Sequence, residues 1–282
     1  MEPLSFSLRV LRLLLLIAGG VGLLALAGCA FYRTSLFPAE RATLADADRQ
    51  ACASGLQLWP VAGPDYRALV TAHPPAMVRG VVVVFHGNAG TAAHRIYYPQ
   101  ALERLGWRVV LAEYPGYGAR AGRPDERTLI SDGAETARQA VQAFGGPLIL
   151  WGESLGAAVA AGVAARPDVP TAGLVLLTPW CDLPALAAHL YPFLPVRLFV
   201  RDRFDNAAAL KAFHGPVAIL MAERDEIIPA AHTQRLFEQA PPPKRLWVFP
   251  AAGHNSWPSA PGLPWWEEVM AFVAPKPAEA DH

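Results

Sequence analysis

Short apolar runs alternate with helical patterns from Gly80 to Val273. This alternation is typical of a parallel β-sheet whose strands are joined by crossover helices. Residues 81–85 are four valines and a phenylalanine, as expected for a strand that is covered on both faces. The pattern predicts six central strands, at residues 81–85, 108–112, 148–151, 174–177, 217–221 and 246–249.

Helical patterns lie between and after these strands, at residues 131–144, 155–165, 231–239 and 265–273. The first helix is predicted to begin at Ser131 or Asp132, with Glu135 in its first turn. Residues before Gly80, including 57–59, are expected to add edge strands. A chain of 282 residues that is 53% hydrophobic suits one α/β domain, predicted over residues 40–274 with a flexible tail at 275–282.

The charge balance argues against one class of partner. The 24 basic and 24 acidic residues cancel, and no basic stripe is interleaved with aromatic residues, so nucleic acid is not an expected partner. The cysteine and histidine spacings do not suit a zinc site.

Residues 152–156 read Gly-Glu-Ser-Leu-Gly, directly after one predicted strand and at the start of an alanine-rich helix. A turn this sharp strains the serine backbone, and the flanking glycines remove side chains that would collide there. Ser154 is therefore the predicted nucleophile, and the Leu155 N–H is a predicted donor to an oxyanion. The alternative is a glycine-rich turn with an incidental serine, which the strand before and the helix after disfavour.

A serine nucleophile needs a base, and the base needs an orienting acid. His254 follows the strand at 246–249 and is the predicted base, with a surface loop histidine as the alternative. Asp225 follows the strand at 217–221 and is the predicted acid, in the expected chain order of serine, acid and histidine. Four other carboxylates remain as alternatives to Asp225, namely Glu223, Glu226, Asp202 and Asp205.

The first central strand ends in His-Gly-Asn-Ala-Gly at residues 86–90. Gly87 would let the chain pass close to a substrate, and the Asn88 N–H is the predicted second oxyanion donor. A plain turn is the alternative. His86 is interpreted as a structural hydrogen-bonding residue. The remaining histidines are expected to be structural or exposed, and they are His73, His94, His189, His214 and His232.

These motifs, with Glu-Tyr-Pro-Gly-Tyr-Gly at 113–118 and Asp-Glu-Ile-Ile-Pro at 225–229, resemble the membrane-anchored branch of the alpha/beta-hydrolases. That branch includes protein depalmitoylases and lysophospholipid lipases, and the resemblance covers residues 80–273. It implies a mostly parallel sheet with helices on both faces, and a Ser-Asp-His acyl hydrolase that needs no metal or organic cofactor and cleaves lipid-like or small acyl esters or thioesters. Two departures are Ala-Glu at 222–223 in place of His-Gly, and Pro115 in place of arginine.

The segment between Thr178 and Val217 is predicted to form a small cap, around residues 183–212. Its apolar residues could line an acyl site or pack a helical hairpin onto the core, and the pattern leaves both open. They are Leu183, Leu186, Leu190, Tyr191, Phe193, Leu194, Leu198 and Phe199. Two rival functions are a peptidase of the prolyl-oligopeptidase branch, although no propeller precedes the domain, and a non-catalytic envelope scaffold, which the intact motifs argue against.

Arg9 and Arg12 precede the 20 uncharged residues from 13 to 32, in the order of a signal peptide. Leu-Ala-Gly-Cys at 26–29 resembles a bacterial lipobox, in which Cys29 would be lipidated and become the mature N-terminus. The alternative is a transmembrane anchor, and a buried core helix is disfavoured. Residues 1–32 are therefore predicted to attach the protein to a membrane, with the catalytic domain on the periplasmic or extracytoplasmic side.

The chain has two further cysteines, Cys52 and Cys181. An oxidising compartment would allow them to form a disulfide, and the alternative is two buried, inert thiols.

Overall fold

The computed structural model describes residues 14, 16, 28, 30–193, 195–196 and 199–275. Cys29 and most of residues 13–32 lie outside the described residues, as do residues 276–282 of the predicted tail. Among the helices that are described, none combines the length and apolar character needed to cross a bilayer.

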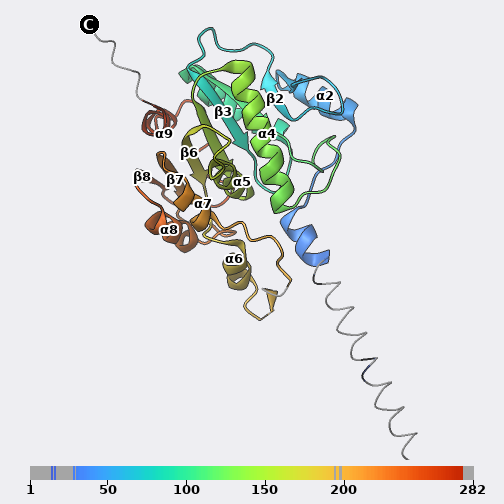
Figure 1. Ribbon diagram of the computed structural model, residues 1–282, viewed down its shortest axis with the longest axis vertical. Helices are drawn as coiled ribbons and strands as arrows, with labels where there is room; N and C mark the ends of the chain where they lie inside the picture. The colour runs from blue at the N-terminus through green and yellow to red at the C-terminus, as the bar shows by residue number, and fades with distance from the viewer. Residues whose placement is uncertain are drawn as a thin grey trace, which may run out of the picture.

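One eight-stranded sheet forms the centre of the domain, in the order β1-β2-β4-β3-β5-β6-β7-β8 (Figure 1). All neighbours from β4 to β8 are parallel, whereas β1 and β2 are antiparallel to their neighbours. The six predicted central strands and the edge strands predicted before Gly80 are confirmed. The bounds are β1 (Leu56–Trp59), β2 (Ala68–Thr71), β3 (Gly80–Phe85), β4 (Trp107–Ala112), β5 (Leu148–Glu153), β6 (Thr171–Leu177), β7 (Val217–Ala222) and β8 (Lys244–Phe249).

Helices cover both faces of the sheet. Val81, Val83 and Phe85 of β3 face one apolar core, and Val82 and Val84 face the other, so this strand is buried on both sides as its sequence predicts. Helices α4 (Glu126–Phe144), α5 (Leu155–Ala164), α7 (Asn206–Ala212) and α8 (Ala230–Gln239) contribute to the first core, and α2 (Leu44–Ala53), α3 (Tyr97–Leu102) and α9 (Trp265–Val273) to the second. In Figure 1, α4 and α5 lie in front of the sheet.

Helix α4 begins earlier than predicted. Its N-cap is Asp125, whose side chain accepts a hydrogen bond from the Thr128 N–H at 2.7 Å, so the prediction of Ser131 or Asp132 as N-cap is wrong. Burial of Leu129 stabilises the additional turn. The Asp132 carboxylate instead forms ion pairs with arginines outside the helix, at 2.7 Å from Arg67 and 2.6 Å from Arg120.

The sheet has a topological switch point at β3 and β5. The connection from β3 leads to β4 on one side, and the connection through α4 returns to β5 on the other side. Crossovers that leave in opposite directions open a crevice outside the carboxyl ends of the two strands. The loop after β3 and the turn after β5 therefore meet at one crevice, which is where the sequence places the predicted nucleophile and oxyanion donors.

Of the two alternatives that the sequence leaves open for Cys52 and Cys181, the disulfide is not formed, because both are free thiols in the described part of the chain. Cys52 is exposed on α2, which packs beside β1 at one edge of the sheet, whereas Cys181 is buried just after β6. Strands β1 and β6 are five positions apart, and each position is about 4.8 Å. That separation far exceeds the Cα distance of roughly 7 Å beyond which a disulfide cannot form.

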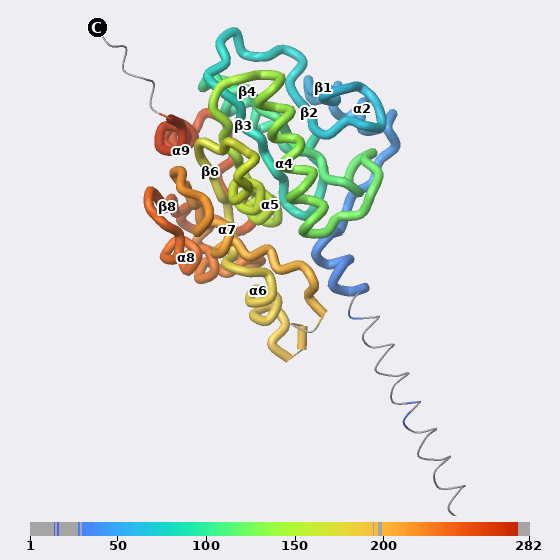
Figure 2. Tube along the Cα trace, viewed as in Figure 1, coloured from blue at the N-terminus to red at the C-terminus, as the bar shows by residue number. Residues whose placement is uncertain are grey.

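The N-terminal helix is described over residues 30–36. Figure 2 shows this helix, in blue, at the end of the domain where α6 (Leu183–Leu190) lies, away from α9. Helix α6 follows β6 and belongs to the predicted cap segment, so the chain enters the domain on the side of the sheet's carboxyl edge.

Candidate active site

The predicted nucleophile lies in a strained turn between β5 and α5. Ser154 has φ 55° and ψ −115°, outside the regions that residues with a side chain normally adopt. Its backbone N–H is held by the Leu177 carbonyl of β6 at 2.9 Å. The hydroxyl therefore stands at the junction of strand and helix, directly above the carboxyl edge of the sheet.

The two flanking glycines are required by close backbone approach. A methyl group on Gly152 would lie 2.2 Å from the Gly156 carbonyl oxygen, and one on Gly156 would lie 1.9 Å from the Phe85 carbonyl oxygen. Both neighbours are backbone atoms, which cannot move aside as the end of a flexible side chain can. The turn after β5 can thus pack against the end of β3 only when both positions are glycine.

The structure brings Ser154, His254 and Asp225 together in one hydrogen-bonded row. Ser154 Oγ lies 3.1 Å from His254 Nε2, and His254 Nδ1 lies 2.7 Å from Asp225 Oδ2. The three residues come from different loops, and each is less than one-tenth exposed, at 7%, 9% and 8% respectively. A hydroxyl, an imidazole and a carboxylate in this order can move a proton from the serine to the histidine.

Backbone donors fix the orientation of the Asp225 carboxylate. Its Oδ1 accepts hydrogen bonds from the N–H groups of Ile227 at 2.9 Å and Ile228 at 2.7 Å. Its other oxygen, Oδ2, is left for His254. The Asp225 side chain is 1% exposed, so these hydrogen bonds form away from solvent.

The four alternative carboxylates have other partners. Glu223 accepts from the Ala251 N–H at 2.9 Å, and Glu226 accepts from the His254 N–H at 3.0 Å, which lowers the pKa of Glu226. These two residues brace the loop that carries His254. The remaining two contact helix N-termini, where Asp202 accepts from the first N–H of α4 and Asp205 caps α7.

The loop after β3 lies against the nucleophile turn. A methyl group on Gly87 would lie 3.7 Å from Cβ of Ser154, so Asn88 follows at the edge of the site. The Asn88 carbonyl accepts from the Tyr117 hydroxyl at 2.8 Å, which holds the peptide in place. Within the described chain, neither the Asn88 N–H nor the Leu155 N–H donates to another protein group. Both predicted oxyanion donors are therefore free to bind a substrate oxygen.

His86 is confirmed as a structural residue. Its ring is buried, with Nδ1 2.6 Å from the Gly87 carbonyl and Nε2 3.1 Å from the Glu113 carboxylate. The Tyr114 hydroxyl donates to the His86 carbonyl at 2.7 Å. These contacts hold the base of the loop that presents Asn88.

One cluster beside the site was not predicted. Glu153 precedes the nucleophile, and its carboxylate accepts from Arg95 at 3.2 Å, Tyr97 at 2.9 Å and Tyr98 at 3.2 Å. Burial, and then the charge of Glu153, raises the pKa of both tyrosines. Trp257, three residues after His254, packs its ring 5.6 Å from the Tyr97 ring. The cluster links the nucleophile turn to the histidine loop, and no local sequence pattern connects these distant residues.

The apolar residues of the cap segment divide into two groups. Leu183 and Leu186 of α6 are buried in the core, so packing onto the core explains them. Leu190, Tyr191 and Phe193 are exposed, whereas Phe199 is half-buried. Leu194 and Leu198 lie outside the described residues.

The described residues include no group of three or more histidine, cysteine, aspartate or glutamate side chains arranged to hold a metal ion.

Comparison with known proteins identifies similar sequences. A family model described as serine aminopeptidase, S33, matches residues 76–204. An uncharacterised protein of Mycobacterium tuberculosis (strain H37Rv) is 39% identical over 181 residues, which are 62% of this chain and 62% of that protein. The lysophosphatidylserine lipase ABHD12 of Danio rerio is 31% identical over 199 residues, 64% of this chain and 50% of the lipase. The match thus spans between half and two thirds of these relatives.

A solved structure supports the architecture. The lipase-esterase related protein from Clostridium acetobutylicum superposes with a TM-score of 0.59 over 74% of this chain and 100% of that chain. Its sequence identity is 14%, so the similarity concerns the fold. The fold predicted from the strand and helix pattern is confirmed, with a mostly parallel eight-stranded sheet and flanking helices.

Proposed function

We propose that this chain, whose fold is that of the alpha/beta hydrolases, is a serine hydrolase that cleaves carboxylic ester or thioester bonds through an acyl-enzyme on Ser154. The observation that carries the proposal is the row of hydrogen-bonded groups from Ser154 through His254 to Asp225, at 3.1 and 2.7 Å. Such a row activates a hydroxyl that is otherwise a weak nucleophile.

In the first half of the reaction, Ser154 Oγ attacks the substrate carbonyl carbon while its proton passes to His254 Nε2. The Asp225 carboxylate accepts from the Nδ1–H, which keeps Nε2 free to take that proton and stabilises the imidazolium that forms. The bond to the alcohol or thiol then breaks, and His254 gives the proton to the leaving group. The acyl group remains on Ser154.

In the second half, His254 takes a proton from water, and the resulting hydroxide attacks the acyl carbonyl. The acid is released, and the proton returns to Ser154 Oγ. In both halves the Asn88 and Leu155 N–H groups would donate to the carbonyl oxygen as it becomes negative. The N-terminus of α5 adds a favourable dipole at the same place. No metal ion or organic cofactor takes part in the proposed chemistry.

Lipid-like acyl esters are the substrate class that we propose. The support is the similarity to a lysophosphatidylserine lipase, together with the uncharged residues 13–32, which would hold the domain at a membrane. Lipidation at Cys29, or a single membrane crossing, would provide the attachment, with the domain on the periplasmic or extracytoplasmic side.

A peptidase is the second candidate, because the matching family model is described as a serine aminopeptidase. The same row of residues can attack an amide. The two candidates differ in the leaving group, so purified full-length protein in detergent should be tested on p-nitrophenyl esters of graded chain length, an acyl thioester, lysophosphatidylserine and aminoacyl p-nitroanilides. We expect hydrolysis of esters or thioesters, and faster turnover of the anilides would favour the peptidase.

The nucleophile is tested by replacing Ser154 with alanine. We expect Ser154→Ala to abolish ester hydrolysis and labelling by a fluorophosphonate probe, because no other hydroxyl contacts His254 in the described structure. Ser131→Ala, at an exposed position on α4, is the matched control and should retain both. Undiminished labelling of Ser154→Ala would contradict the proposed mechanism.

A further inference from the structure

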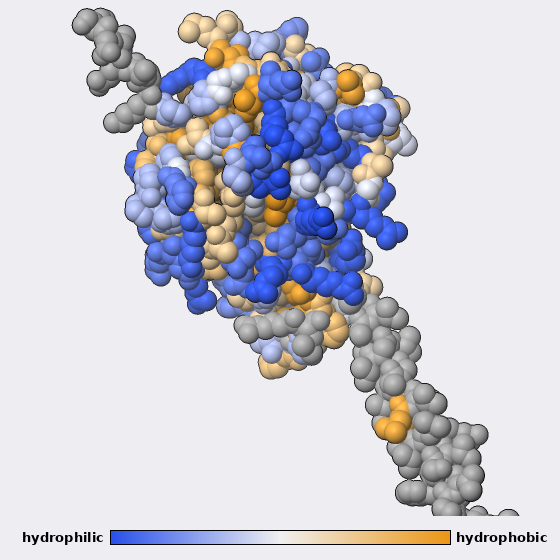
Figure 3. All heavy atoms as spheres, in the orientation of Figure 1, coloured by the Kyte–Doolittle hydropathy of each residue, from blue (hydrophilic) through white to orange (hydrophobic). Residues whose placement is uncertain are grey.

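Large apolar side chains are exposed at one end of the domain. Phe193 is 97% exposed, and Phe31, Leu190 and Tyr191 are 50%, 40% and 37% exposed. Figure 3 shows apolar side chains gathered at this lower end of the molecule, around α6. We call these four residues the apolar tip. Soluble monomers seldom expose large apolar side chains together unless the surface meets a membrane or a partner.

The apolar tip combines two segments that are distant in the sequence. The Phe31 ring of the N-terminal helix contacts the Tyr191 ring edge-on, with centroids 5.7 Å apart. Close by, the Tyr32 hydroxyl donates to Asp202 at 2.5 Å. These contacts hold the N-terminal helix against the cap segment. Phe31 and Tyr191 therefore belong to one exposed surface.

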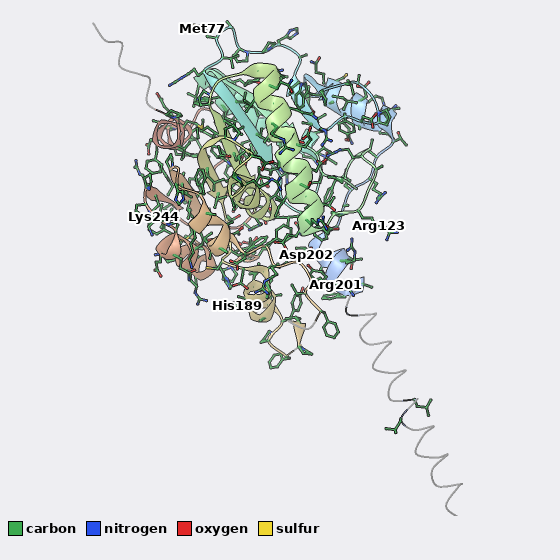
Figure 4. The ribbon with its side chains drawn as sticks, in the orientation of Figure 1. Met77, Arg123, His189, Arg201, Asp202 and Lys244 are labelled. Carbon is green, nitrogen blue, oxygen red and sulfur yellow. The ribbon has the colours of Figure 1, made fainter. Side chains whose placement is uncertain are left out.

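Three exposed arginines lie at the same end of the domain as the apolar tip. Arg33 belongs to the N-terminal helix and donates to the Pro124 carbonyl at 3.0 Å, and Arg201 and Arg203 line a hollow of about 440 Å³ together with Asp182, Pro184, Ala185 and Val200. In Figure 4, Arg201 and His189 lie at this end of the molecule, whereas Met77 lies at the opposite end. Aromatic residues flanked by arginines suit a bilayer interface, where rings lie at headgroup depth and guanidinium groups meet lipid phosphates.

The place where the uncharged N-terminal segment joins the domain favours a membrane over a soluble partner at the apolar tip. Residues 13–32 carry no charge, and the last of them, including Phe31, belong to the N-terminal helix that leads into the domain. Whatever membrane these residues enter therefore begins beside the apolar tip. The same helix also reaches the candidate active site, because the Asn88 side chain donates to the Ser35 carbonyl at 3.4 Å.

We propose that the apolar tip rests in the interfacial layer of a lipid bilayer, with Arg33, Arg201 and Arg203 at the phosphate groups, and that this orientation delivers acyl substrates from the membrane to Ser154. The second half of this statement rests on the proposed function, whereas the membrane contact does not. A protein partner or a second copy of the chain is the competing occupant of the surface.

Photo-crosslinking tests the membrane contact directly. Full-length protein with Phe193→p-benzoylphenylalanine is reconstituted in vesicles of phosphatidylethanolamine and phosphatidylglycerol and irradiated, and its adducts are identified by mass spectrometry. Met77→p-benzoylphenylalanine is the matched control, since Met77 is 80% exposed at the far end of the domain. We expect at least fivefold more lipid adduct at position 193 than at 77. Equal yields, no lipid adduct, or adducts only with protein would overturn the proposal.

Hydrolysis tests the delivery of substrate. We expect Phe193→Asp to reduce turnover of lysophosphatidylserine in vesicles at least fivefold and to leave turnover of soluble p-nitrophenyl acetate within twofold, whereas Met77→Asp changes neither. Equal loss on both substrates, or no loss on either, would refute delivery through the apolar tip. Crosslinking in a Ser154→Ala background is independent of catalysis, so failure of the proposed function and failure of the membrane contact give different results.

Discussion

The substitution Asp225→Asn tests the mechanism most sharply, because the structure fixes how the new amide must lie. One carboxylate oxygen accepts two backbone hydrogen bonds, from Ile227 and Ile228, and the other faces His254 Nδ1. In the variant, the amide oxygen would keep the two backbone donors. The NH2 group would then face Nδ1 and donate to it, so that the ring proton would move to Nε2. A protonated Nε2 cannot take the proton of Ser154.

The reverse orientation of the amide is too costly to rescue the variant. It would point the NH2 group at two backbone N–H donors, the buried one of Ile228 and the partly buried one of Ile227, and each unsatisfied donor costs about 1–3 kcal/mol. A total of about 2–6 kcal/mol makes the inactive orientation favoured by about 30-fold or more. We therefore expect kcat to fall about ten-thousandfold, the loss that the equivalent change causes in serine proteases. This corresponds to about 5 kcal/mol of transition-state stabilisation.

The assay is steady-state hydrolysis of a p-nitrophenyl ester, with thermal unfolding to check the fold. Asp205→Asn is the matched control, because asparagine also caps helices well and Asp205 caps α7 away from the row. The double variant Asp225→Asn with Ser154→Ala should lose little more than Ser154→Ala alone, since the three residues act as a unit. If Asp225→Asn kept more than a tenth of the activity with unchanged stability, the assignment of Asp225 would be wrong.

Two further predictions concern stability. Gly156→Ala should destabilise the fold by about 3 kcal/mol or more, because its methyl group would overlap the Phe85 carbonyl. The melting temperature should therefore fall by roughly 6–12 °C. Gly63→Ala is the control, because Gly63 has open space around it. A normal melting temperature for Gly156→Ala would contradict the packing of the turn. Burial, and then the charge of His189, lowers the pKa of His232, so the unfolded chain binds a proton here more readily than the folded protein. The free energy of unfolding should therefore decrease as the pH drops below about 6.5. In thermal unfolding at pH 7.5 and 5.5, the melting temperature of His232→Asn should decrease less between the two pH values than that of the unsubstituted protein. An identical decrease would exclude His232 as its source.

The parts of the fold and site that could be predicted depend on signals carried by neighbouring residues. The four valines of β3 show directly that the strand is buried on both faces. The two glycines around Ser154 indicate that backbone atoms approach closely there, and a methyl group on Gly156 or Gly152 would lie only 1.9 or 2.2 Å from a carbonyl oxygen. Such constraints act within a few residues, so a single sequence reveals them.

The parts that could not be predicted depend on contacts between distant residues. The start of α4 was placed too late because Asp132 looks like an N-cap, and its pairing with Arg67 and Arg120 is visible only in three dimensions. The cluster of Glu153 with Tyr97 and Tyr98 spans more than fifty residues for the same reason. Whether Cys52 and Cys181 pair could not be decided, because a sequence does not show how many strands separate two residues.

The sheet topology explains why the four loops that carry the predicted site residues meet at one edge of the sheet. All parallel strands from β4 to β8 end at the same edge, and the chain reverses its direction of travel between β3 and β5. Loops after β3, β5, β7 and β8 therefore lie at one edge of the sheet, and the crevice at the switch point opens between β3 and β5. Helix α6 begins at the same edge, since it follows β6, and the N-terminal helix reaches it through Asn88. The apolar tip thus lies on the side of the domain where the candidate site opens, and an ester at a bilayer surface would approach from that side.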